Sequence, residues 1–196
     1  MSEREKILAE TEKFVLAHMA KNDAAHDTDH IFRVVHLART LCQAYPQADP
    51  FRTELLAWLH DMTDSKLASN LGQGAITEFL SRFSLPEADI AFVTEGLPYI
   101  SYRKHPKLSP EIPLEIRIVQ DADRIDAMGA VGVARTFAYG GAKGRSLTRS
   151  LDHFDEKLLL LYDLLSTQEA RRIARSRRDF LHAFYRQYKE ETNSQP

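Results

Sequence analysis

Apolar residues recur three or four positions apart along nearly the whole chain, which is the spacing of one face of an α-helix. The clearest stripe consists of Ile31, Val34, Val35, Ala38 and Leu41. We find no alternating pattern of the kind that a half-buried β-strand produces, and no internal repeat or low-complexity run. The sequence therefore predicts an all-α fold.

Prolines and glycines divide this helical pattern. Four prolines predict a loop over residues 97–113, and a strongly apolar helix is expected from about 114 to 127, continuing or kinking through Gly129 and Gly132 to Tyr139. The basic, glycine-rich residues 140–145 follow a helix and lack the Gly-Lys-[Ser/Thr] ending of a phosphate-binding loop, which favours a connecting turn. Two long helices are expected at the end, at about 154–165 and 168–191.

Size and composition predict one domain in a reducing compartment. A chain of 196 residues with 43% hydrophobic residues can bury one core, so we expect a single domain over 1–196, with a functional core at about 20–140 and C-terminal helices at about 150–191. One cysteine, Cys42, excludes an intrachain disulfide. No apolar run approaches the roughly 20 residues of a membrane span, and no apolar signal region opens the chain, so a cytoplasmic location is expected. A net charge of -2 argues against nucleic acid as a partner. A homodimer remains open.

Three polar elements interrupt apolar helical stripes. They are His30, the pair His60-Asp61, and Asp123. Imidazoles and carboxylates together suit a divalent metal ion, with Mn, Fe, Co, Mg, Zn and Ni all open. Such an ion lowers the pKa of a bound water, so this set of residues predicts hydrolysis.

The same residues resemble the HD-domain phosphohydrolase superfamily. The superfamily pattern of a His, a later His-Asp pair and a later Asp is present in His-x-x-Arg-Val at 30–34, Leu-His-Asp at 59–61 and Ala-Asp-Arg-Ile-Asp-Ala at 122–127. Residues 120–135 are similar to one bacterial subgroup of small HD hydrolases, which resembles metal-dependent nucleotide pyrophosphohydrolases. The resemblance spans about residues 20–190 and implies an HD-domain helical bundle in which His30, His60, Asp61 and Asp123 bind the metal ion.

The choice between Asp121 and Asp123 stays open from periodicity alone. Two residues apart on a helix, their side chains point about 200° from each other, so one of them is expected to reach the metal ion. Apolar residues flank both positions. The superfamily resemblance places the ligand at Asp123, and Asp121 is the alternative, with a substrate or supporting contact as its other role.

Further residues near these elements suit substrate chemistry. The resemblance implies that Asp64 is the general base and that Asp61 is a catalytic metal ligand. The alternative for Asp64 is a carboxylate at a helix end, paired with Lys66. Lys66, Arg33 and Arg124 can donate to phosphate. His26 lies four residues before His30 and can line the pocket.

These residues predict hydrolysis of a phosphoanhydride or phosphoester in a small nucleotide. The subgroup resemblance implies a nucleoside triphosphate pyrophosphohydrolase. The alternative is a module that retains a metal ion and senses a nucleotide without turnover.

Overall fold

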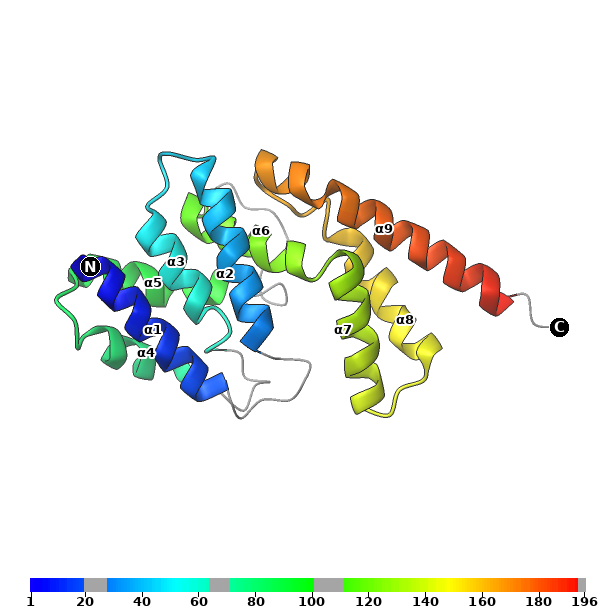
Figure 1. Ribbon diagram of the computed structural model, residues 1–196, viewed down its shortest axis with the longest axis horizontal. Helices are drawn as coiled ribbons and strands as arrows, with labels where there is room; N and C mark the ends of the chain where they lie inside the picture. The colour runs from blue at the N-terminus through cyan, green and yellow to red at the C-terminus, as the bar shows by residue number, and fades with distance from the viewer. Residues whose placement is uncertain (20–27, 64–70, 101–110, 194–196) are drawn as a thin grey trace.

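A computed structural model describes residues 1–19, 28–63, 71–100 and 111–193 (Figure 1). Within these ranges all regular structure is helical, which confirms the predicted all-α class. The elements in chain order are α1 (Glu3–Met19), α2 (Thr28–Gln43), α3 (Pro50–Leu59), α4 (Gly72–Leu80), α5 (Glu87–Ile100), α6 (Leu114–Asp126), α7 (Gly129–Ala142), α8 (Leu147–Glu156), the short 3-10 helix η1 (Leu158–Leu160) and α9 (Gln168–Asn193).

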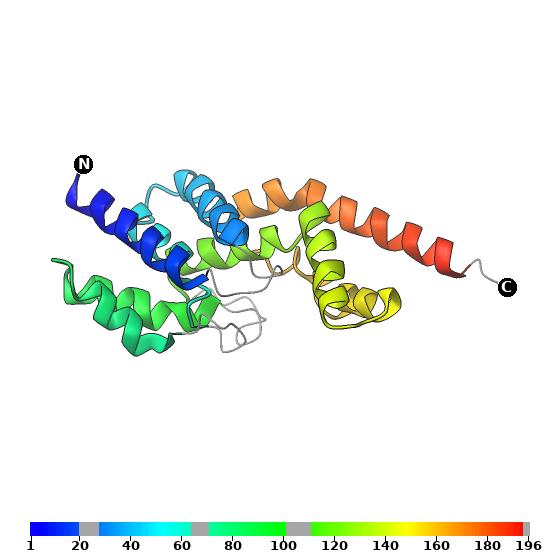
Figure 2. The same ribbon diagram turned by 60° about the horizontal axis from the view of Figure 1, so that its bottom comes forward.

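Helix α6 occupies the centre of the molecule. It packs against α2, α3 and α5 on one side of the fold and against α7 and α9 on the other. Its residues Ile118, Val119, Ala122 and Ile125 are fully buried. Figures 1 and 2 show α1 to α5 gathered around one half of α6, while α7, α8 and the long α9 extend beyond its other end. The polar residues Gln120, Asp121, Arg124 and Asp126 of α6 are also buried, so their side chains face neighbouring parts of the fold.

Helix α3 begins with a complete N-terminal cap. The side chain of Asp49 accepts hydrogen bonds from the backbone N–H groups of Phe51 and Arg52, and Pro50 occupies the first helical position. The buried face of α3 includes Leu55, Leu56 and Leu59. This packing fixes the C-terminal end of the helix, where the His-Asp pair follows.

The predicted loop over 97–113 is wrong at its beginning, because α5 continues through Pro98 to Ile100. A proline inside a helix leaves the carbonyl four residues earlier without its N–H donor. That carbonyl belongs to Thr94, and it accepts a hydrogen bond of 2.9 Å from the Gln73 side-chain amide of α4. A side chain from a neighbouring helix thus replaces the missing backbone donor and allows the helix to continue.

The helix predicted at 154–165 is also wrong. Helix α8 begins earlier, where Ser146 caps it by accepting from Arg149 N–H, and it ends at Glu156. Lys157 then leaves helical geometry, with φ −144° and ψ −60°, and η1 and a turn follow. The buried Leu158, Leu161 and Leu165 have helical spacing in the sequence, and this spacing misled the prediction.

Glycines define the beginning of α7. Gly129 has φ +72°, a conformation that side chains rarely adopt, so the α6–α7 segment is two helices. A Cβ at Gly132 would lie 2.0 Å from the Ala127 carbonyl oxygen, so glycine is required where α7 passes the end of α6. The expected connecting turn at 140–145 is shorter than predicted, because α7 runs to Ala142. Among the described residues, no helix is both long enough and apolar enough to cross a membrane.

We predict that Gly132→Ala destabilises the protein by about 1–3 kcal/mol, because the added methyl group overpacks the α6–α7 junction. Gly141→Ala is the matched control in the same helix. No atom lies within 4 Å of a Cβ there, so this variant is expected to be more stable by about 0.4–1 kcal/mol. Denaturant unfolding of both variants tests the prediction, and equal stabilities would contradict it.

Candidate metal centre

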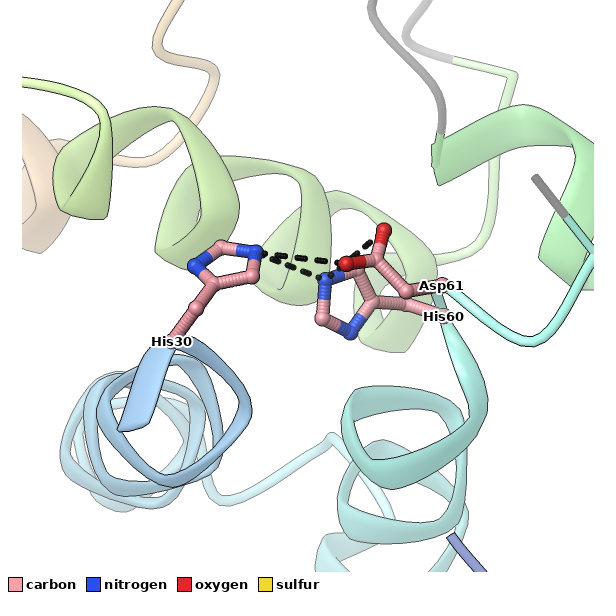
Figure 3. Close-up of side chains that lie close together, drawn as sticks. All are labelled: His30, His60 and Asp61. Carbon is pink, nitrogen blue, oxygen red and sulfur yellow. Dashed lines mark hydrogen bonds and ion pairs between the residues drawn. The ribbon is translucent and has the colours of Figure 1, made fainter. Parts of the chain in front are cut away.

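Three helices bring the predicted ligands together. His30 lies in the first turn of α2, His60 and Asp61 directly follow α3, and Asp123 lies on α6. Both histidines are buried, whereas the carboxylates of Asp61 and Asp123 are partly exposed. Figure 3 shows the His30, His60 and Asp61 side chains pointing toward one another.

The distances within this group suit a single ion. His30 Nε2 and His60 Nε2 lie 3.3 Å apart. The two carboxylate oxygens of Asp61 each approach one of them, with Oδ2 lying 3.5 Å from His30 Nε2 and Oδ1 lying 3.5 Å from His60 Nε2. One ligand atom from each of these three residues falls within 4.8 Å of the others. Asp123 Oδ1 adds a fourth donor, 3.5 Å from His30 Nε2.

In both histidines, the hydrogen-bond partner of Nδ1 determines whether Nε2 carries a hydrogen. His60 Nδ1 lies 2.8 Å from the Ala57 carbonyl oxygen, and His30 Nδ1 lies 2.8 Å from Asp126 Oδ2. Both partners are acceptors, so each Nδ1 carries a hydrogen, and each Nε2 of the neutral ring is an unprotonated acceptor. Two such acceptors facing each other beside two carboxylates require a cation between them. The residues therefore fit a divalent metal ion.

Electrostatics support the same conclusion. Burial lowers the pKa of His60, but the negative charges of Asp61 and Asp123, the Ala57 carbonyl and Asp126 outweigh it and raise the pKa above its usual value. The surroundings of this imidazole thus favour positive charge. A divalent ion bound at Nε2 would supply that charge.

Asp126 supports the centre from behind His30, and the sequence analysis did not assign it a role. Its carboxylate is fully buried, yet its pKa is well below the usual range. Burial raises this pKa, but hydrogen bonds from His30 and Arg33 and the positive charge of the Arg33 guanidinium outweigh burial and lower it. Arg135 Nη1 lies 2.8 Å from Asp126 Oδ2 and 3.0 Å from His30 Nδ1. Because a guanidinium only donates, His30 shares its proton with the carboxylate and not with Arg135.

The signal that could have identified Asp126 is its spacing. It follows Asp123 by three residues, so both carboxylates share one face of α6. Arg135 had no comparable signal, because a single arginine in the middle of a helix such as α7 is common on surfaces. Only the packing of α7 against α6 shows that Arg135 lies beside Asp126.

Asp121 lies apart from the metal centre. Its buried carboxylate accepts hydrogen bonds from the backbone N–H and the hydroxyl of both Ser166 and Thr167, at 2.7–3.2 Å. Burial raises its pKa, and these hydrogen bonds and Arg124 lower it in part, leaving it raised overall. The residue therefore ties α6 to the start of α9, while Asp123 faces His30.

Arg124 also lies apart from the ligand cluster, in contrast to the expected contact with phosphate. It is 2% exposed, and its Nη1 donates to the Leu164 carbonyl oxygen at 2.6 Å. Three residues after Asp121, it shares the helix face that packs on the segment before α9. Arg33 lies beside the centre, bound to Asp126. His26, Asp64 and Lys66 lie outside the described residues.

Comparison with known proteins places this architecture in a family. The HD domain family matches residues 28–128, which include all four predicted ligands. The protein YpgQ of Bacillus subtilis is 35% identical over 181 residues, covering 89% of this chain and 88% of its own. Its crystal structure in complex with ADP superposes with a TM-score of 0.83 at 32% identity, covering 97% of each chain.

A second solved structure, an HD-superfamily hydrolase from Bacillus thuringiensis, is 36% identical with a TM-score of 0.77, and covers 99% of this chain and 100% of its own. The fold and the paired His and Asp residues define an all-α protein with a site suited to a metal ion. The chain belongs to the HD domain family, the group that includes this hydrolase.

We predict that Asp123→Asn removes the bound metal ion while the protein stays folded, because Asp123 faces His30 and its carboxylate is partly exposed. Asp121→Asn is the matched variant two residues away. It should retain the metal ion but unfold more easily, by at least about 2 kcal/mol, because its amide N–H groups would face the donors of Ser166 and Thr167.

Metal analysis of the purified proteins and thermal unfolding measure the two effects. Asp61→Ala should behave like Asp123→Asn, and an excess of chelator should remove the ion from the native protein. Loss of the ion from Asp121→Asn together with its retention in Asp123→Asn would reverse the ligand assignment.

Proposed function

We propose that this protein is a metal-dependent phosphohydrolase that cleaves a nucleoside triphosphate to the monophosphate and pyrophosphate. The observation that carries the proposal is the pair of imidazole Nε2 atoms, 3.3 Å apart and flanked by carboxylates, with arginines beside them. The carboxylates and imidazoles suit a hard or borderline divalent ion. The arginines suit a substrate that carries several negative charges.

His30, His60, Asp61 and Asp123 would hold the ion in this proposal. When bound, it supplies positive charge that lowers the pKa of a water molecule and stabilises the phosphoryl group under attack. Asp64 accepts the proton of the attacking water, whose oxygen forms a bond to the α-phosphorus as the bond from that phosphorus to its bridging oxygen breaks. Pyrophosphate then leaves with the bridging oxygen.

The relatives support a nucleotide as the substrate class. The crystal structure of YpgQ contains ADP, and that protein matches 97% of this chain. The B. thuringiensis relative is an HD-superfamily hydrolase. Arg33 and Lys66 remain in the proposal as phosphate contacts and His26 as a pocket residue, whereas the buried Arg124 and the fully bonded Asp121 are omitted.

We expect the protein with added Mn²⁺ to convert nucleoside triphosphates, ribo or deoxy, to monophosphate and pyrophosphate, and chelator to abolish this activity. Chromatography of the products from a nucleotide panel measures it, and Asp61→Ala is the inactive control. Tight binding of nucleotides without cleavage of any of them would favour the alternative, a nucleotide-sensing module that retains a metal ion.

Asp64→Asn should lower kcat by roughly 10²–10⁴-fold, because an amide cannot accept the proton of the attacking water. Nucleotide affinity and metal content should change little, because a general base acts mainly in the transition state. Turnover equal to that of the native protein would remove Asp64 from the mechanism, and His26 would be tested next as the base.

A further inference from the structure

One oxygen of the Asp126 carboxylate is shared between a proposed metal ligand and a helix that contributes no ligand. Asp126 Oδ2 accepts from His30 Nδ1 and from Arg135 Nη1, each at 2.8 Å. Arg33 donates to Oδ1 of the same carboxylate through Nε at 2.6 Å. His30 and Arg33 lie on α2, whereas Arg135 lies on α7. Of these three donors, Arg135 alone connects the carboxylate to the C-terminal helices.

The junction between α6 and α7 brings Arg135 to this position. Gly129, with φ +72°, begins α7, and Gly132 passes so close to Ala127 that a Cβ would lie 2.0 Å from the carbonyl oxygen. Arg135 follows Gly132 by three residues, so both lie on the face of α7 that is turned toward the end of α6. Its side chain meets there the carboxylate of Asp126, the last residue of α6.

The orientation of this carboxylate affects the metal centre through one imidazole ring. Asp126 is fully buried, so its protein partners determine where its oxygens point. The direction of Oδ2 sets the tilt of the His30 ring through the hydrogen bond to Nδ1, and the ring places Nε2 among the other ligand atoms. Partners that lie behind a ligating histidine typically change metal affinity by about 10–100-fold when they are altered.

We infer that Arg135 is a positioning residue of the metal centre and acts on His30 through the Asp126 carboxylate. This inference rests on the metal ion of the proposed function and concerns how tightly that ion is held. Arg135 lies beyond residues 28–128, which match the HD domain family and contain the four proposed ligands. The affinity of the HD core for its ion then depends on how α7 packs against α6.

The positive charge of Arg135 has the opposite effect on a cation. Repulsion between the guanidinium and the ion weakens ion binding, whereas the hydrogen bond to Asp126 strengthens it by holding His30 in place. The guanidinium lies 3.0 Å from Nδ1 of the ring, and the ligand cluster lies at the Nε2 edge. The side chain of Arg135 is 25% exposed, so water screens its charge and the hydrogen bond is expected to dominate.

The Mn²⁺ affinity of Arg135 variants, measured by titration calorimetry, tests this role. Arg135→Met removes every donor but retains a long side chain, so it separates hydrogen bonding from packing. It should weaken Mn²⁺ binding by about tenfold, the lower end of the usual range, because Arg33 still binds the carboxylate. Arg135→Lys retains a charged donor for Asp126 and should recover most of the loss.

Asp126→Asn shows whether Arg135 acts through this carboxylate. Alone, it should weaken Mn²⁺ binding by about 10–100-fold. Adding Arg135→Met should cause little further loss, because the carboxylate that connects Arg135 to His30 is already gone. Arg172→Ala is the matched control: it removes an arginine that pairs with Glu169 at an exposed position on α9, and it should leave Mn²⁺ binding unchanged.

Tighter Mn²⁺ binding by Arg135→Met would overturn the inference, because repulsion would then dominate, and so would native affinity in that variant. Additive losses in the double variant would overturn it too, since Arg135 would then act independently of Asp126. If Asp126→Asn does not fold, the comparison of Arg135→Met with Arg135→Lys decides the question. No nucleotide enters these titrations, so the expected losses of Mn²⁺ affinity without any nucleotide cleavage would contradict the proposed function alone.

Discussion

A buried carboxylate must have partners, and α6 buries two of them at the centre of the fold. Asp121 accepts hydrogen bonds from the segment that begins α9, and Asp126 binds His30 and Arg33 of α2 and Arg135 of α7. Each of these contacts is directional, unlike the apolar packing around it. The positions of α2, α7 and α9 relative to α6 are therefore set by where these two carboxylates find their donors.

The division of roles along α6 follows from helix geometry. Asp121 and Asp123 point in different directions, one toward α9 and one toward His30, whereas Asp123 and Asp126 lie on one face. Asp126 fixes which nitrogen of His30 carries the hydrogen, and so presents the other nitrogen to the ligand cluster. Under the proposed ligand set, one short helix thereby contributes a structural anchor, a ligand position and a support for a second ligand.

The sequence predicted the fold class well because the spacing of apolar residues that marks a helix can be recognised from neighbouring positions alone. Its errors occurred where long-range contacts override local signals. Pro98 does not end α5 because Gln73 supplies the missing donor, and the buried Leu158 lies in a 3-10 helix that follows the break at Lys157. The group His30, His60 and Asp61 was predicted from residue types and the HD resemblance. Arg124 was assigned to phosphate because its sequence neighbours gave no indication that it binds the Leu164 carbonyl.

The ligand residues come from α2, from the end of α3 and from α6, which are far apart in the sequence. Under the proposed ligand set, one ion cross-links three separate parts of the chain, and the unfolded chain has no comparable site. Ion binding then adds to the free energy of unfolding, by about 2.7 kcal/mol when the free ion is at 100 times its Kd. The cellular supply of the ion would thus govern how long the protein survives as well as how fast it works.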